Sequence, residues 1–306
     1  MRRDFYHTGL EVSRSGLRQL MDAQNPAKRY FVKGTSGVVV PVNGVYESGS
    51  DTNDGLTWDT AFATIAKAIS VSNGLINWSA SPWATNIEIH IAPGKYAEAL
   101  TSLPYGCALI GYGDAWDADG ERGVRIKPAS GSPVDVGACI NTKIQNINFE
   151  SADTSRVFDA TVLNNVQMVH CRFAGAPEAT TSTAGIYTSD SVMLTVRDCR
   201  FEYLDCGIDF VYADGGDSFT RGHIEGNYFT YISEAGVRVS ANLVAPASMI
   251  VGNIICQGGQ TLAIGIDINI TNTIGIYGNI ITATDGIEGD TTGSYVGGNY
   301  CNGALE

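Results

Sequence analysis

The chain has 306 residues, of which 44% are hydrophobic and 36 are glycine, so it is long enough to bury a substantial apolar core. Its formal net charge of −13 argues against a nucleic acid or an anionic membrane surface as partner. No stretch reaches the ~18 apolar residues of a membrane-spanning helix, so no membrane insertion is expected.

Residues 1–44 are predicted to form an N-terminal attachment segment. Residues 15–23 suggest a short helix and residues 30–32 an extended strand. No apolar run follows the two arginines at positions 2 and 3, so we expect no signal peptide and synthesis in the cytoplasm. The segment either packs beneath the rest of the protein or docks it onto a larger assembly, and both interpretations stay open. Its basic residues contrast with the acidic remainder of the chain: Arg2, Arg3, Arg14, Arg18, Lys28, Arg29 and Lys33.

Residues 60–72 are predicted to form a capping helix at the start of a second domain, residues 45–306. Its apolar residues recur at positions i, i+3, i+4 and i+7, which is typical of an amphipathic helix: Phe62, Ile65, Ala66 and Ile69. The preceding loop, residues 51–54, lacks the spacing of a calcium-binding EF-hand loop. We therefore predict no bound metal and no other cofactor.

Two short phrases repeat between about residues 87 and 301, and they predict a solenoid of stacked coils. The second phrase reads Gly-apolar-x-apolar, as in Gly207–Phe210, Gly236–Val239 and Gly265–Ile268. Alternation of period two, broken by Gly, Asn and Asp, favours β-strands, so we predict an all-β parallel β-helix. The first phrase ends on an apolar residue that we expect inside the coil: Phe149, Phe173, Phe201, Phe229, Ile255, Ile281 and Cys301.

The register of the repeats predicts which side chains stack from coil to coil. One turn should hold an amide ladder of Asn227, Asn253, Asn279 and Asn299. Cys171 and Cys199 also share a register, and the seven cysteines contain no CxxC pair, so we expect free thiols in or near the core. Tyr203 and Tyr231 form either a sugar-stacking strip or the packing of a coil edge.

The outward positions of the second phrase are the candidate functional site: Tyr187, Asp209, Arg238, Asp267 and Glu288. Asp209 and Asp267 lie two coils apart, ~9–10 Å, which is near the upper end of the ~6.5–9.5 Å spacing in inverting glycosidases. Asp267 and Glu288 lie one coil apart, near the ~5–5.5 Å of retaining enzymes. With Arg238 between them, two carboxyls can acquire separate acid and base roles. The alternative is a cross-strand ion-pair ladder with a purely structural role.

The order of these elements resembles the pectin-lyase-like superfamily of right-handed, single-stranded parallel β-helices. It is most similar to the branch found in bacteriophage tailspikes and other virion proteins, over roughly residues 45–301. The resemblance implies right-handed coils, and a function as a polysaccharide lyase, a glycoside hydrolase or a non-catalytic structural or adhesive protein. The motifs that carry it are the Asp/Gly-rich loop 49–58, Phe62-x-Thr64-Ile65-x-x-Ala68-Ile69, Ile89-x-Ile91-Ala92-Pro93-Gly94-x-Tyr96 and Leu109-Ile110-Gly111-x-Gly113.

The expected function is that of a phage virion protein, of tailspike, fibre or decoration type, that serves particle structure or attachment to host surface glycans. Its expected partners are other virion proteins, through residues 1–44, and a host surface polysaccharide, and we expect a homotrimer. The alternative is a polysaccharide depolymerase with Asp209, Arg238, Asp267 and Glu288 as catalytic residues. A cell-associated carbohydrate enzyme or adhesin is disfavoured because no export signal is expected. The sequence leaves open whether the protein is an enzyme.

Overall fold

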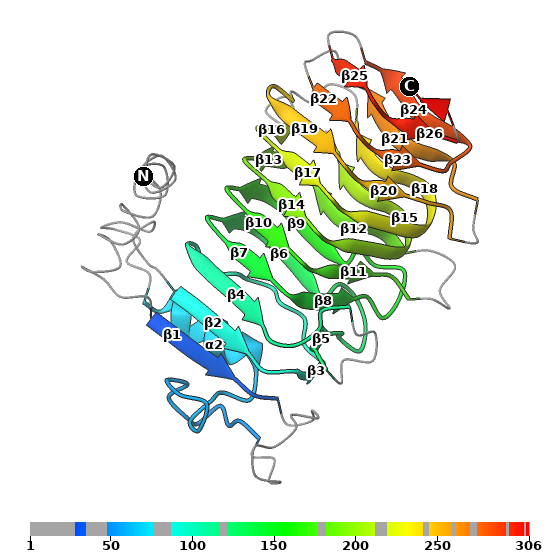
Figure 1. Ribbon diagram of the computed structural model, residues 1–306. Helices are drawn as coiled ribbons and strands as arrows, with labels where there is room; N and C mark the ends of the chain where they lie inside the picture. The colour runs from blue at the N-terminus through cyan, green and yellow to red at the C-terminus, as the bar shows by residue number, and fades with distance from the viewer. Residues whose placement is uncertain are drawn as a thin grey trace, which may run out of the picture.

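The computed structural model shows coils of chain stacked into an elongated column of strands (Figure 1). Strands of successive coils pair in parallel, and among the described residues the pair formed by the last two strands is the antiparallel exception. The predicted all-β parallel β-helix, with one short helix near the N-terminus, is confirmed. The structure describes residues 28–34, 48–75, 87–116, 122–176, 182–211, 219–240, 245–258, 261–269, 274–291, 294–302 and 304–305.

One wall of the column is a ten-stranded sheet whose strands follow one another in chain order. In β2 the side chains of Ile87, Ile89 and Ile91 point into the core while Glu88 and His90 point outward, so the period of two in the sequence sets the buried face. The strands are β1 (Lys28–Val32), β2 (Ile87–Ile91), β4 (Cys107–Gly111), β7 (Lys143–Gln145), β10 (Gln167–Val169), β14 (Thr195–Arg197), β17 (His223–Glu225), β19 (Ser248–Val251), β22 (Ile274–Tyr277) and β25 (Tyr295–Gly297).

A seventeen-stranded sheet forms the rest of the coil wall and contains both repeated phrases. Its two longest strands, β15 and β18, each carry the first phrase at the N-terminal end and the second phrase at the C-terminal end. The strands are β3 (Gly94–Tyr96), β5 (Val124–Ile126), β6 (Val134–Ile140), β8 (Ile147–Glu150), β9 (Phe158–Asn164), β11 (Arg172–Ala174), β12 (Ser182–Thr188), β13 (Asp190–Val192), β15 (Arg200–Phe210), β16 (Phe219–Thr220), β18 (Tyr228–Val239), β20 (Ile254–Ile255), β21 (Ile264–Asn269), β23 (Ile280–Ile281), β24 (Asp285–Asp290), β26 (Tyr300–Cys301) and β27 (Ala304–Leu305).

The apolar residues of the first phrase form a continuous stack inside the column, as predicted. Phe173, Phe201 and Phe229 are fully buried and pair in register across β11, β15 and β18. Their rings stack with centroids 5.0 and 4.6 Å apart. The second phrase begins with glycine because the ring stack leaves no room for a side chain at that position. A Cβ on Gly207 would lie 2.5 Å from the ring of Phe229 and 2.5 Å from the carbonyl oxygen of Gly236.

The amide ladder is confirmed, and each rung is buried. Asn227 Nδ2 donates to Asn253 Oδ1 at 3.0 Å, and Asn253 Nδ2 donates to Asn279 Oδ1 at 3.0 Å. Each Nδ2 also donates to the carbonyl of an earlier strand, such as Ile224 O for Asn253, so the ladder ties neighbouring coils together. The seven cysteines are free, and the Cys171 backbone N–H points at Cys199 Sγ, 3.4 Å away, in the same register.

The helix α2 spans Ile65–Asn73 and packs beside β1 and β2 at the N-terminal end of the column (Figure 1). It begins later than residue 60 because the Thr64 side chain caps it by accepting from Lys67 N. The Glu98 carboxylate accepts from the next two backbone N–H groups. Of the predicted apolar stripe, Ile65 and Ile69 are buried on the helix, Phe62 is buried but precedes the helix, and Ala66 is exposed.

The strand β1 belongs to the column, although the sequence places it in the attachment segment. It pairs in parallel with β2 over its whole length, from Lys28 opposite Ile87 to Val32 opposite Ile91. The rest of the predicted segment, residues 1–27 and 35–44, lies outside the described residues. The docking role of that segment stays a prediction.

Candidate functional site

The predicted outward positions do line up in one row across successive strands. Tyr187 of β12 pairs with Asp209 of β15, which pairs with Arg238 of β18. Arg238 in turn pairs with Asp267 of β21, and Asp267 with Glu288 of β24. The row faces outward because the residues on either side of Tyr187, Asp209, Arg238 and Asp267, such as Ile208 and Phe210, are buried.

Sequence reasoning missed two further members of this row. Asp159 of β9 pairs with Tyr187, and Asp135 of β6 pairs with Asp159. Both aspartates alternate with buried apolar residues, but neither follows the glycine that marks the second phrase, so the repeat did not reveal them. We call the full set the acidic row: Asp135, Asp159, Tyr187, Asp209, Arg238, Asp267 and Glu288.

Arg238 lies at the centre of the acidic row, between two carboxylates that it does not hold tightly. Its Nη1 is 3.7 Å from Asp209 Oδ2, and its Nε is 3.7 Å from Asp267 Oδ2. Its short contact, 2.7 Å from Nη2, goes to Glu234 Oε2, four residues earlier in the same strand. The guanidinium therefore neutralises part of the charge but leaves hydrogen-bonding capacity on both aspartates.

Asp209 is the buried member of the row, only 8% exposed. Its Oδ1 is enclosed and has no hydrogen-bond partner. Burial raises the pKa of Asp209 above its ordinary value, although Arg238 and Arg156 act in the opposite direction. Burial also raises the pKa of Asp267, against the effects of Arg238 and of a 2.6 Å hydrogen bond from Asn269 Nδ2. Glu288, at the end of the row, is exposed.

A second arginine, which the sequence did not single out, serves the other half of the row. Arg156, just before β9, forms a 2.9 Å ion pair with Asp159. Its guanidinium carbon also lies 3.1 Å from the centre of the Tyr187 ring, so one face of that ring is covered by a cation–π contact. Tyr203 and Tyr231 stack on each other with centroids 4.7 Å apart, which agrees with the packing of a coil edge; a role in sugar stacking stays a prediction.

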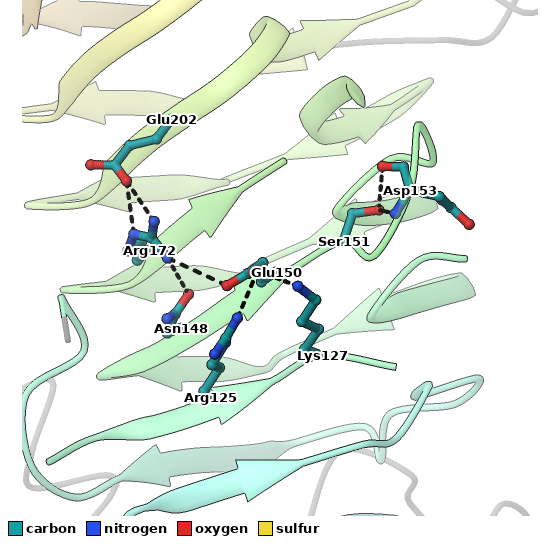
Figure 2. A network of polar contacts seen from close by, with 8 residues as sticks. All are labelled: Arg125, Lys127, Asn148, Glu150, Ser151, Asp153, Arg172 and Glu202. Carbon is teal, nitrogen blue, oxygen red and sulfur yellow. Dashed lines mark hydrogen bonds and ion pairs between the residues drawn. The ribbon is translucent and has the colours of Figure 1, made fainter. Parts of the chain in front are cut away.

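A second outward set of charges lies on β5, β8, β11 and β15, and here every carboxylate is tightly paired (Figure 2). Glu150 Oε1 lies 2.7 Å from Arg125 Nη2 and 2.6 Å from Lys127 Nζ. Arg172 donates to Glu202 Oε2 at 2.6 and 2.9 Å and to Asn148 Oδ1 at 3.1 Å. We call this set the ionic network: Arg125, Lys127, Asn148, Glu150, Arg172, Arg200 and Glu202.

The ionic network and the acidic row differ in how well their carboxylates are satisfied. The pKa of Glu150 lies below its usual value. Burial alone would raise this pKa, but the hydrogen bonds from Arg125 and Lys127 have the larger combined effect. In the acidic row the balance is reversed, and burial of Asp209 prevails. Charge-assisted hydrogen bonds of this kind are strong, although Arg125 Nε in the same network is buried without a hydrogen-bond partner. The acidic row keeps a buried acceptor, Asp209 Oδ1, without a donor from the described residues.

The residues that the structure describes were compared with the requirements of a metal site and of a membrane-spanning helix. There, no group of three or more His, Cys, Asp or Glu side chains is placed to hold a metal ion. Over the same residues, no helix is long and apolar enough to cross a membrane. The side chains of the acidic row and its neighbours supply carboxylates, two guanidinium groups and the Tyr187 ring.

A family model described as a protein of unknown function, DUF1565, matches residues 47–306 of the chain. The match begins in the loop before α2 and runs through the last coil, so it covers the acidic row and the ionic network. The first strand, β1, lies outside it. Neither the curated proteins nor the solved structures include a match to this chain.

Proposed function

The chain belongs to the DUF1565 family, whose function is unknown, and we propose that it is a bacteriophage virion protein that attaches the particle to a host surface glycan. The acidic row binds the glycan, and residues 1–44 dock the protein, as a homotrimer, onto other virion proteins. Support for a particle-bound protein comes from the resemblance to pectin-lyase-like tailspikes and from the contrast between a basic N-terminal segment and an acidic remainder.

The observation that carries the glycan-binding role is the unpartnered Oδ1 of Asp209. A buried acceptor without a donor costs ~1–3 kcal/mol, and a ligand that brings an O–H or N–H group removes this cost. Carbohydrates present such donors around every ring. Both carboxylates of the ionic network have close cationic partners, so the unpartnered oxygen of Asp209 is a feature of the acidic row.

Attachment fits the row better than hydrolysis by the Asp209 and Asp267 pair. An inverting glycosidase needs space for the substrate and a water molecule between its two carboxyls. In this row the strand between the two aspartates carries Arg238, whose guanidinium lies 3.7 Å from each of them. That side chain fills the position that the water would need.

A depolymerase remains the second candidate, because a different pair of the row suits retaining hydrolysis. Asp267 and Glu288 lie on directly adjacent strands, ~4.8 Å apart, near the ~5–5.5 Å of retaining enzymes. Burial raises the pKa of Asp267 while Glu288 is exposed, so the two carboxyls have different surroundings, as an acid and a nucleophile require.

One experiment separates attachment from depolymerisation. The full chain is incubated with capsular or exopolysaccharide of the host, and binding, new reducing ends and unsaturated-uronide absorbance are measured. We expect binding without turnover, and weaker binding by Asp209→Asn. Turnover that Asp267→Asn abolishes would replace attachment with the depolymerase. Absence of both binding and turnover on every host glycan would refute both.

The docking half of the proposal needs a separate test on particles. Residues 1–27 precede β1, so their deletion leaves every described strand in place. We expect particles assembled with this deletion to lack the protein while the purified variant still binds glycan. Normal incorporation of the deleted protein into particles would show that the N-terminal segment has no docking role.

A further inference from the structure

We propose that the glycan recognised by the acidic row is one that carries free amino groups. This inference rests on the proposed glycan-binding function and concerns the class of sugar. It follows from the charge of the row and from the unpartnered acceptor on Asp209, two observations that point to the same ligand chemistry.

The charge of the row strongly favours a cationic ligand. Six carboxylates lie in it or directly against it, and two guanidinium groups oppose them, which leaves four negative charges. The carboxylates belong to Asp135, Asp159, Asp209, Glu234, Asp267 and Glu288, and the guanidinium groups to Arg156 and Arg238. A sugar acid brought to this face would meet like charge. A glycan with ammonium groups meets opposite charge at each successive strand.

The unpartnered oxygen of Asp209 favours an ammonium group over a neutral hydroxyl as the ligand's donor. Its Oδ1 is buried and unpartnered, and Arg238 approaches the other oxygen, Oδ2, no closer than 3.7 Å. A sugar hydroxyl offers this oxygen one neutral donor. An ammonium group offers three donors and a positive charge, and a charge-assisted hydrogen bond is about twice as strong as a neutral one.

A metal ion is a poorer match to the same charges. Among the described residues no group of three or more acidic, His or Cys side chains is arranged as a metal site. Asp267 already accepts a 2.6 Å hydrogen bond from Asn269, and Asp159 is paired with Arg156 at 2.9 Å. The remaining negative charge is spread along the solenoid axis, which suits a polymer with repeated ammonium groups.

The test compares sugars that differ only at the nitrogen. Binding of the full chain is measured by calorimetry with a chitosan oligosaccharide, with the N-acetylated chitin oligosaccharide of the same length, and with an oligogalacturonate. We expect the free amine to bind at least ~10-fold more tightly than the N-acetylated oligomer, and the oligogalacturonate not to bind. Equal binding of the amine and its N-acetylated form would overturn the inference and leave the glycan-binding function standing. No binding of any glycan would overturn the function itself.

Matched variants separate a built site from general attraction to an acidic protein. Glu288→Gln removes an exposed carboxylate from the acidic row, and Glu225→Gln removes an exposed one from the outer face of β17. We expect Glu288→Gln to weaken chitosan binding by ~2–5-fold, Asp209→Asn to weaken it by ~10-fold, and Glu225→Gln to leave it unchanged. Equal losses in Glu288→Gln and Glu225→Gln would show that only the net charge of the chain matters, which overturns the proposal.

Discussion

Replacing one arginine in each outward charge set tests whether the acidic row is a structural ladder or a binding face. In Arg172→Met the ionic network loses three hydrogen bonds, two to Glu202 and one to Asn148, at a residue that is 5% exposed. Removing one partner of a buried pair typically costs ~3–5 kcal/mol, because the other charge stays buried. Arg200 still pairs with Glu202, so we expect the lower end of that range.

In Arg238→Met the lost side chain makes longer and more exposed ion pairs than Arg172 does. The Arg238 side chain is 28% exposed, its closest partner Glu234 is 57% exposed, and both aspartates lie 3.7 Å away. Such pairs contribute ~0.2–1 kcal/mol, so we expect a loss of at most ~1 kcal/mol in the free energy of unfolding. Glycan binding, by contrast, should change, since the charge of the acidic row becomes more negative.

The assay is urea denaturation of both variants followed by circular dichroism, with the slope of the transition checked, because a solenoid does not always unfold in one step. The two losses should differ by ~2 kcal/mol or more. If Arg238→Met destabilises the protein as much as Arg172→Met does, the acidic row is a structural ladder and the case for a binding site fails.

Four further predictions test the account of the fold and its charges. Burial raises the folded pKa of Asp209, so its contribution to stability is intact below the unfolded pKa of ~3.9 and is lost as pH rises through the folded pKa. The change in the free energy of unfolding caused by Asp209→Asn should therefore be more favourable at pH 7 than at pH 3. Burial also acts to raise the folded pKa of Glu150, but hydrogen bonds lower it overall, so its contribution is present above ~4.3 and lost on acidification; Glu150→Gln should destabilise at pH 7 and less at pH 3, and the same sign for both variants in urea melts would contradict this. Asn253→Ala leaves Asn227 N and Nδ2 without an acceptor and Ile224 O without its donor, so we expect a loss of ~3 kcal/mol or more by urea denaturation; a loss under ~1 kcal/mol would show that water replaces the ladder. Gly207→Ala forces a Cβ against the Phe229 ring and a backbone carbonyl, which should cost ~1–3 kcal/mol or more, and an unchanged thermal midpoint would contradict the crowding.

The repeat in the sequence was sufficient to predict the buried side of each coil. A strand that alternates with period two has one face in the core, so Phe201 and Phe229 had to stack once the register was known. The same register placed Asp209, Arg238 and Asp267 in one outward row and Asn227, Asn253 and Asn279 in one ladder. The buried stack, the outward row and the amide ladder all follow from the repeat period, which can be read from one sequence.

The sequence did not predict where α2 begins or which residues of the less regular coils join the acidic row. The start of α2 was misplaced because Thr64 caps it, and Glu98, more than thirty residues further along, accepts from the next two backbone N–H groups. Asp135 and Asp159 were missed because their coils replace the marker glycine with other residues. Arg156 lies in the loop before β9, where no repeat fixes the register.

What the sequence by itself determined was the solenoid, its register and the existence of an outward charged row. What only the tertiary structure decided was whether those charges are satisfied. Arg172 and Arg238 both lie on outward faces among carboxylates, yet one holds Glu202 at 2.6 Å and the other stands 3.7 Å from Asp209. Pairing depends on the reach of each side chain and on how much water is excluded around it. A repeat of backbone positions contains neither quantity, so the difference between a structural network and an open site appears only in the folded chain.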